Sequence, residues 1–168
     1  MSVMPRFLCD EMLGRLCHYL RAAGYDALLA RDGASDAELL QQCHTEGRFF
    51  LTQDMLVREH KAARDVALIL PPVDLNHLAA LLTEYYHLDW LGHAFTRCLV
   101  DNTRLEIADD AALAHAPADV FGSGEPLYHC PTCGRIYWRG SHYKRMHAKL
   151  VAWQTARKAP STYSSVEV

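Results

Sequence analysis

Short apolar runs recur along the first half of the chain, and each is bounded by a polar residue or by proline. They occupy residues 6–9, 25–30, 48–52 and 66–70. Runs of this length predict buried β-strands, because helices are usually longer than about ten residues. The sheet that we predict is therefore complete before Pro71.

Amphipathic segments follow these runs, with apolar residues three or four positions apart. We expect helices over residues 12–24, 37–47, 55–64 and 75–88. Ser35 and Glu38 form a capping box at the start of the second helix, and Asp74 can cap the last one. Gly24 and Gly47 allow the left-handed backbone with which helices often end. Strands that alternate with helices predict an α/β fold with a parallel sheet.

The second half of the chain is organised differently. Periodicity is lost from residue 92 to about residue 127, and we place a domain boundary near Gly92. The predicted units are an α/β domain at 4–91, a small basic module at 92–152 and a disordered tail at 153–168.

Composition narrows the class of protein. With 168 residues, 50% of them hydrophobic, the chain can bury one core and a small satellite. No stretch approaches the roughly 18 apolar residues of a membrane helix, and the first residues lack the apolar core of a secretory leader. Six cysteines are too few for a disulfide scaffold of this length. We therefore expect a cytoplasmic protein with no membrane segment.

Charge is unevenly distributed along the chain. The net charge is −3, yet residues 135–158 contain basic side chains and no acidic ones. Within this stretch, residues 137–145 mix cations with aromatic rings, which favours contact with single-stranded RNA. We predict that Arg139, Lys144 and Arg145 bind the nucleic acid. Alternatively, the aromatic residues fill a small core and the cations are solvated on a helix.

Three aspartates occupy positions that suggest a shared site. Asp10 and Asp54 follow predicted strands, and Asp36 begins the helix between them. Because strand ends and helix starts meet at one edge of a parallel sheet, these carboxylates are expected to converge. Magnesium and manganese prefer such oxygen ligands. The alternative is that each aspartate is a solvated loop residue or a helix cap; Thr52, just before Asp54, can support the site through its hydroxyl.

The cysteines near the C-terminus have the spacing of a zinc site. Cys130 and Cys133 form a C-x-x-C turn, which places two thiolates at adjacent corners of a zinc tetrahedron. Cys98 and Asp101 have the same spacing, with a carboxylate in the second position, so the predicted site has three thiolates and one carboxylate. A nearby histidine is an alternative fourth ligand, the candidates being His129, His142 and His147. Redox chemistry of the C-x-x-C pair is a further alternative, although the residues after Cys133 resemble a strand and not a helix.

The other cysteines and two early arginines have simpler explanations. Cys9, Cys17 and Cys43 fall at apolar strand or helix positions and are interpreted as small core residues. Arg15 and Arg21 lie on the first predicted helix, where they either meet phosphates or are solvated.

Taken together, these motifs resemble the Mut-seven C-terminal ribonuclease family, a branch of the PIN-like nucleases with a zinc ribbon appended. The resemblance runs from about Arg6 to Met146. It is carried by FLCDEMLGRL with LRAAGYD, by RFFLTQD, by R-C-x-x-x-N and by CPTCGRIYWRGSH. The family pattern has a cysteine at the position of Asp101, which makes the zinc site of this chain a weaker and more exchangeable one.

Membership in this family implies a PIN-like three-layer α/β/α fold and a magnesium- or manganese-dependent ribonuclease. The acidic catalytic positions map onto Asp10, Asp36 and Asp54, with Asp10 and Asp54 as metal ligands. A fourth carboxylate is common in PIN-like sites, and Glu38, Glu59 and Asp65 are all candidates. The competing hypothesis is a non-catalytic RNA-binding or ribosome-associated module with a vestigial nuclease site.

Overall fold

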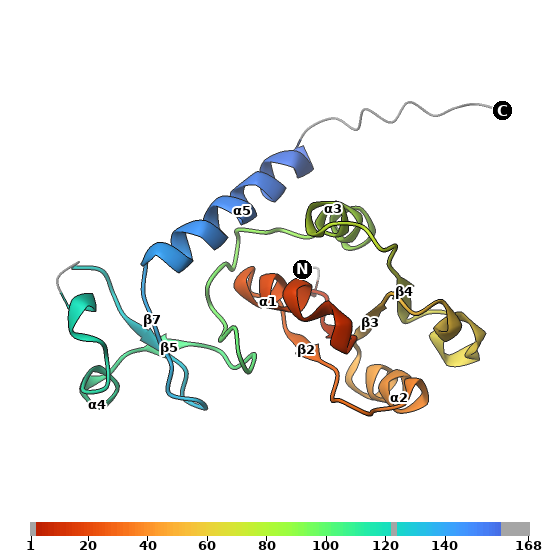
Figure 1. Cartoon of the computed structure of the whole chain (residues 1–168), viewed down its shortest axis with the longest axis horizontal. Coiled ribbons are helices and arrows are strands. Elements are labelled where there is room, and N and C mark those ends of the chain that lie inside the picture. The colour runs from red at the N-terminus through yellow and green to blue at the C-terminus, as the bar shows by residue number, and fades with distance from the viewer. Residues whose placement is uncertain (1–2, 122–123, 159–168) are drawn as a thin grey trace.

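The computed structural model describes residues 3–121 and 124–158 (Figure 1). Its main sheet has four parallel strands in the order β2-β1-β3-β4. The strands are β1 (Phe7–Cys9), β2 (Ala27–Leu29), β3 (Phe49–Thr52) and β4 (Ala67–Ile69). All four lie within the apolar runs of the sequence, and the predicted α/β class is confirmed.

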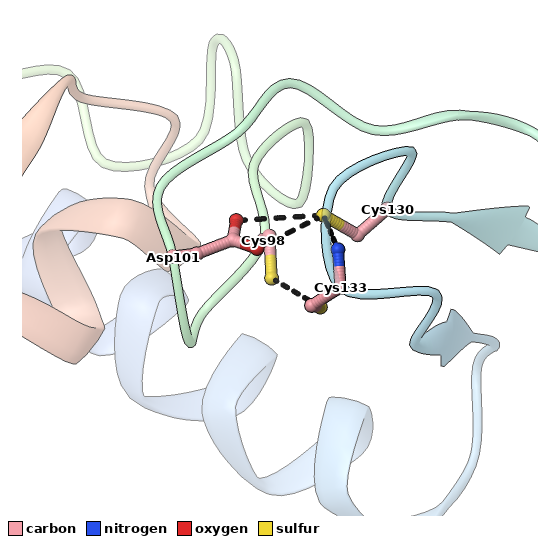
Figure 2. Close-up of side chains that lie close together, drawn as sticks. All are labelled: Cys98, Asp101, Cys130 and Cys133. Carbon is pink, nitrogen blue, oxygen red and sulfur yellow. Dashed lines mark hydrogen bonds between the residues drawn. The ribbon is translucent and has the colours of Figure 1, made fainter.

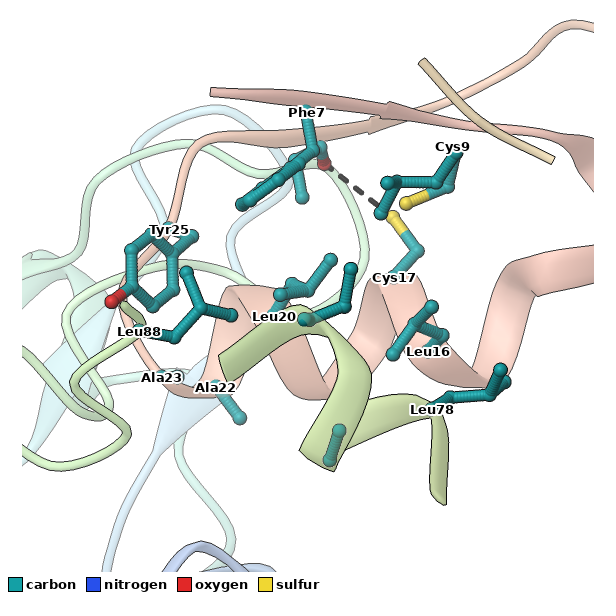
Figure 3. Close-up of a cluster of buried hydrophobic side chains, with 14 of the residues drawn as sticks. Phe7, Cys9, Leu16, Cys17, Leu20, Ala22, Ala23, Tyr25, Leu78 and Leu88 are labelled. Atoms are coloured by element: carbon teal, nitrogen blue, oxygen red, sulfur yellow. Dashed lines mark hydrogen bonds between the residues drawn. The ribbon is translucent and has the colours of Figure 1, made fainter. Parts of the chain in front are cut away.

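Helices cover both faces of this sheet. Along β1, Phe7 and Cys9 point into the larger core and Leu8 points into a smaller one, as the alternation of a strand requires. Helices α1 (Gly14–Ala22) and α3 (Leu75–Tyr86) pack in the larger core, part of which is drawn in Figure 3. Helix α2 (Asp36–Glu46) packs in the smaller core. The molecule therefore has the predicted three layers.

The helix ends carry the signals expected from the sequence. Ser35 accepts a hydrogen bond from the Glu38 backbone, and the Glu38 carboxylate accepts one in return from the Ser35 backbone. Gly47 ends α2 with φ at 65°, a conformation that costs glycine little. Asp74 caps α3 through the backbone of His77. The Ser35 and Asp74 caps end the loops that follow β2 and β4 at the carboxyl edge of the sheet.

The predicted helix at 55–64 is wrong. The segment forms two 3-10 helices, η2 (Met55–Glu59) and η3 (Lys61–Ala63), separated by an extended His60. Only Val57 and Ala63 of this stretch are buried. Since most helix stability comes from packing of an apolar face, two buried residues six positions apart are too few to support a continuous helix.

The region from residue 92 to 127, which the sequence predicts as loop, contains short elements. Strand β5 (Glu106–Ile107) joins β6 (Tyr128–His129) and β7 (Ile136–Tyr137) in a small antiparallel sheet. A turn of helix, α4 (Asp110–Leu113), and the 3-10 helix η4 (Ala118–Val120) lie between β5 and β6. A 3-10 helix, η1 (Glu11–Leu13), precedes α1 in the first domain.

The last helix, α5 (Ser141–Lys158), packs against α3 in the larger core. Its Met146, Leu150 and Trp153 are buried in the larger core, and the Trp153 ring lies 4.8 Å from that of Trp90. The prediction of a disordered tail from residue 153 therefore begins too early, because burial of an aromatic ring stabilises the helix at this point. The rest of that predicted tail, residues 159–168, lies outside the described residues.

An ion-pair cluster around Asp26 joins the two parts of the chain. Its carboxylate accepts hydrogen bonds from Arg48 at 2.7 Å, from Arg6 at 3.0 Å and from the Asn102 amide at 2.7 Å. Burial alone would raise the pKa of Asp26, but these hydrogen bonds outweigh it and hold the pKa well below its usual range. Asn102 in turn accepts from the Ala27 backbone. The loop that precedes β5 is thereby fixed against β2.

Candidate functional site

The three predicted catalytic aspartates line one pocket at the carboxyl edge of the parallel sheet. The pocket has a volume of about 500 Å³. Asp10 lies directly after β1, Asp36 is the first residue of α2, and Asp54 lies two residues after β3. Glu11 and Asp32 also line the pocket. Five acidic residues from three segments therefore face the same space.

Thr52 connects two of these aspartates. Its hydroxyl donates to the Asp10 carboxylate at 2.7 Å and accepts from the Asp54 backbone at 3.0 Å. The Thr52 side chain is fully buried, so the hydroxyl is held in one place. Each aspartate also caps the 3-10 helix that follows it, Asp10 through Glu11 and Asp54 through Leu56. The positions of both carboxylates are therefore set by local backbone as well as by Thr52.

Asp36 approaches the pocket from the opposite wall. Its carboxylate is about one-third exposed and lies 3.9 Å from the His60 ring nitrogen, a contact that becomes an ion pair when the histidine is protonated. Asp36 does not cap α2, because Ser35 does. The capping alternative is thus excluded for Asp36, whereas Asp10 and Asp54 do cap.

The carboxylates line one pocket, but their oxygen atoms do not form a compact group of metal ligands. Among the described residues, the one acidic, cysteine or histidine group whose ligand atoms all lie within 4.8 Å is the cysteine cluster. The candidates for a fourth carboxylate lie elsewhere: Glu38 is bound to Ser35, Glu59 lines a different pocket, and Asp65 lines neither. Glu11 and Asp32 line the carboxylate pocket instead. Glu11 follows Asp10 directly in the sequence, a signal that sequence reasoning missed.

The predicted cysteine site is assembled in the structure. Cys98, Asp101, Cys130 and Cys133 place their ligand atoms within 4.8 Å of one another. Figure 2 shows the four side chains converging from two loops, one before β5 and one between β6 and β7. None of the candidate histidines belongs to the group. The fourth ligand position is therefore that of Asp101.

The distances within this cluster fit a tetrahedral metal ion. The sulfur atoms of Cys98 and Cys133 are 3.7 Å apart, and zinc–sulfur bonds of about 2.3 Å give a tetrahedral edge of about 3.8 Å. The Cys130 sulfur lies 3.3 and 3.4 Å from the Asp101 carboxylate oxygens, where an edge of about 3.6 Å is expected for zinc. The donor set can hold a metal ion such as zinc.

Hydrogen bonds from the surroundings reach Cys98, Asp101 and Cys130, whereas burial raises the pKa of the Cys133 thiol to about 12. The Cys133 backbone donates to the Cys130 sulfur at 3.4 Å. The Leu99 backbone donates to the Tyr137 oxygen, which leaves the phenol proton free to be donated to the Cys98 sulfur 3.1 Å away. Desolvation would raise the pKa of Asp101, but hydrogen bonds from Thr103 and from the thiols lower it well below its usual range. Such outer contacts orient metal ligands.

The C-x-x-C pair does not open a helix. It occupies the turn between β6 and β7, and Gly134 after it has φ at 77°. A thioredoxin-like redox motif would begin a helix, so this geometry favours a metal knuckle.

The three remaining cysteines have the structural role that the sequence predicts. Cys9, Cys17 and Cys43 are fully or almost fully buried. Burial raises the pKa of the Cys43 thiol to about 11, so the thiol form dominates at neutral pH.

The basic residues near the C-terminus lie around the start of α5. The Arg139 guanidinium lies 5.7 Å from the centre of the Tyr143 ring and 3.7 Å from the Glu125 carboxylate. Lys144 and Arg145 are exposed on α5. Tyr137 and Trp138 have different surroundings. Tyr137 contacts the cysteine cluster, whereas Trp138 is 38% exposed.

Arg21 does not meet phosphates. It is buried, and its guanidinium donates to the carbonyls of Ala27, Leu99 and Val100. Both sequence interpretations of Arg21 are therefore wrong, because it holds the loop of the cysteine cluster against β2. Arg15, six residues earlier on α1, is exposed.

Comparison with known families agrees with this geometry. A family model described as the Mut7-C RNAse domain matches residues 5–150. The chain belongs to the Mut7-C RNAse domain family. The matched range includes the carboxylate pocket and the cysteine cluster, so both sites are part of the Mut7-C RNAse domain. Its description as an RNAse domain implies an RNA substrate.

Other comparisons add no relative. Neither a curated protein nor a solved structure matches the chain. None of the helices in residues 3–121 and 124–158 has the length and apolar character needed to span a membrane.

Proposed function

We propose that the chain hydrolyses RNA phosphodiester bonds at the carboxylate pocket, with a magnesium or manganese ion held by Asp10 and Asp54. The observation that supports this most is that carboxylates from β1, α2 and the β3 loop line one open pocket. Oxygen donors suit these hard cations, which usually keep several waters and bind substrate phosphate as well. When bound, such an ion supplies positive charge to the scissile phosphate and an activated water.

The protein residues have separate roles in this proposal. Asp10 and Asp54 hold the ion, and Thr52 orients the Asp10 carboxylate through its 2.7 Å hydrogen bond. Asp36 faces them from α2 and positions the attacking water or a second ligand. The spread of the carboxylates leaves room for the phosphate, because a magnesium site that includes substrate is not closed by protein ligands alone.

The cysteine cluster has a structural role in the proposal. Zinc bound by Cys98, Asp101, Cys130 and Cys133 supplies a cross-link between the loop before β5 and the β6–β7 turn. Metal analysis of the purified protein should give about one zinc per chain, and Cys130→Ser should lose it. Retention of full zinc occupancy by that variant would place the metal elsewhere.

A cleavage assay tests the nuclease proposal. Purified protein with manganese should cut a labelled single-stranded RNA. An Asp10→Asn, Asp54→Asn double variant should be slower by a hundredfold or more, since loss of one preorganised electrostatic stabiliser costs on the order of 10²–10³ in rate. Asp65→Asn is the matched control, because Asp65 is exposed and outside the pocket lining. Equal rates for the double variant and the wild type would end the proposal.

The alternative is an RNA-binding module without catalysis. The observation that favours it is the separation of the carboxylates, which do not form a compact ligand group among the described residues. In the same assay, salt-dependent RNA binding by the wild type with no manganese-dependent cleavage would favour this alternative over the nuclease.

A further inference from the structure

A second pocket, the basic pocket, has a volume of about 350 Å³ and lies along β4, an edge strand of the parallel sheet. Its walls are η2 and η3 on one side and the end of α3 on the other, and three residues of β4 form its floor. The side chains on its walls that carry charge or an aromatic ring are Arg58, Glu59, His60, Lys61, Arg64 and Tyr85. The cations come from the segment that the sequence predicts as a plain amphipathic helix.

Three cations of this pocket, Arg58, Lys61 and Arg64, form no ion pair with any residue that the structure describes. Within the described ranges, no ion pair or side-chain hydrogen bond involves Arg58, Lys61 or Arg64. Glu59 is the one acid among the lining residues, so three permanent positive charges face one negative charge. A concave surface with surplus positive charge attracts anions.

An exposed aromatic ring completes the pocket. Tyr85 is 61% exposed although it sits on a helix whose other aromatic side chain is packed. The neighbouring Tyr86 contacts Phe49 with ring centres 4.7 Å apart, and the Tyr85 ring lies 6.4 Å from that of Tyr86. Tyr85 is therefore held on a rigid support with a face available for stacking.

Two contacts connect this pocket to the carboxylate pocket. Asp54 caps η2, so the chain passes from the carboxylates to Arg58 within one short 3-10 helix. The ring of His60, which lines the basic pocket, reaches Asp36, which lines the other one. A strand whose phosphate lies among the carboxylates can therefore continue into the basic pocket.

We propose that this pocket binds single-stranded RNA next to the cleaved bond, with backbone phosphates on Arg58, Lys61 and Arg64 and one unpaired base stacked on Tyr85. This rests on the proposed function in that the substrate is RNA. Cations alternating with an exposed aromatic ring are the usual means of holding single strands without sequence preference. Duplex RNA presents no free base face to Tyr85 and binds less well.

The proposal assigns the substrate to a different surface from the C-terminal cations. In Figure 1 the η2–η3 segment lies at one end of the long axis, next to β4, and the small sheet with the start of α5 lies toward the other end. The C-terminal cations around the start of α5 therefore belong to a different part of the molecule from this pocket. Charge removal at the two surfaces separates their contributions.

Fluorescence anisotropy with a labelled twelve-nucleotide oligouridine measures binding in the full chain. The protein carries Asp10→Asn so that it does not cut, and no magnesium or manganese is added. The pocket is tested by the double variant Lys61→Gln, Arg64→Gln and by the single variants Tyr85→Ala and Tyr85→Phe. The C-terminal surface is tested by the triple variant Arg139→Gln, Lys144→Gln, Arg145→Gln. Arg104→Gln with Arg157→Gln is the matched control, since both arginines are exposed and neither lines either pocket.

The expected result is selective for the basic pocket. The Lys61, Arg64 double variant should bind at least about tenfold more weakly and lower the salt slope by about 1.4, since each lost phosphate contact on a single strand removes about 0.7. Tyr85→Ala should weaken binding at least about fivefold, while Tyr85→Phe keeps it, because the ring and not the hydroxyl stacks. The control variant should bind like the parent.

Opposite results overturn the inference. If the pocket variants bind like the parent while the Arg139, Lys144, Arg145 variant loses affinity, the strand lies on the C-terminal surface and the pocket proposal fails, with the nuclease untouched. If the pocket variants lose affinity but the wild type does not cleave RNA, the pocket is supported as an RNA-binding site. The same result overturns the proposed nuclease activity. Equal affinity of Tyr85→Ala and its parent, or of duplex and single strand, contradicts stacking on Tyr85.

Discussion

The two candidate metal sites of this chain differ in how far the protein alone assembles them. In the cysteine cluster, four ligand atoms lie within 4.8 Å of one another, and the 3.7 Å between the Cys98 and Cys133 sulfur atoms matches one edge of a zinc tetrahedron. In the carboxylate pocket, Asp10 and Asp54 are linked through Thr52, and Asp36 faces them from another element. We therefore call the cysteine cluster the closed site, because the protein brings its four candidate ligands together. We call the carboxylate pocket the open site, because its carboxylates stay apart.

This difference follows from what each site is proposed to do. A structural ion needs all its ligands from the protein, so the fold brings the donors together in advance. A catalytic ion shares its coordination with water and phosphate, so the protein supplies only part of the shell. The donor atoms agree, because thiolates suit zinc and carboxylates suit magnesium or manganese.

The loop that carries Asp101 is held against β2 through Asn102 and Asp26, and Asp26→Asn weakens this contact. The asparagine keeps the size of the side chain but removes the negative charge opposite Arg48, whose side chain is only 5% exposed. We expect a loss of about 2 kcal/mol in the free energy of unfolding, since hydrogen bonds to charged groups contribute roughly 1.5–3 kcal/mol and Arg48 keeps its ion pair with Glu46. Chemical denaturation measures it, and Asp65→Asn is the matched control. A change below about 0.5 kcal/mol would show that Arg48 does not need Asp26.

The same residue gives the stability a pH dependence. The pKa of Asp26 is lower in the folded state than in the unfolded chain, where it is about 3.9. Its contribution is therefore complete above that value and is lost as the pH falls toward the folded-state pKa. The wild type should lose stability below about pH 4 more steeply than Asp26→Asn does. Parallel curves for the two proteins would contradict this assignment.

In the open site, Thr52 holds the Asp10 carboxylate and the Asp54 backbone in place. Thr52→Val tests whether cleavage needs the carboxylates to be held in this way. Valine fills the same buried space but cannot donate to Asp10 or accept from the Asp54 backbone. We expect cleavage at saturating manganese to slow about 10- to 100-fold, as for other partners that orient metal ligands. Thr52→Ser keeps the hydroxyl and should stay within a few-fold of the wild type. Wild-type cleavage by Thr52→Val would mean that the carboxylates need no orientation.

Much of this architecture could be predicted from local sequence patterns. The four strands follow from their apolar runs, and the capping box at Ser35 and the cap at Asp74 follow from residue types at fixed spacing. The segment at 55–64 could not, because the periodicity does not reveal that only Val57 and Ala63 find partners in the core. Tertiary packing decides such segments.

For the candidate sites, the sequence patterns predicted residues that line them but not the residues that support them. Asp10, Asp36 and Asp54 were placed by the rule that strand ends meet at one edge. Arg21 was not, since its partners, the carbonyls of Leu99 and Val100, lie 78 and 79 residues away. A basic residue on a helix has the same local pattern whether it is solvated or holds a distant loop.

The smallest effect that we predict concerns the one position at which the closed site departs from four thiolates. Asp101→Cys should raise zinc affinity about tenfold and slow exchange, because thiolates are softer ligands than carboxylates. The Thr103 backbone, which donates to the Asp101 carboxylate at 3.0 Å, can donate to a sulfur there as the Cys133 backbone does to Cys130. Competition with a chromophoric chelator measures the affinity. Asp101→Ser is the control, since it loses the charged ligand and should bind zinc more weakly than the wild type. If Asp101→Ser and Asp101→Cys bind zinc equally, the carboxylate is no ligand and the closed site has only three.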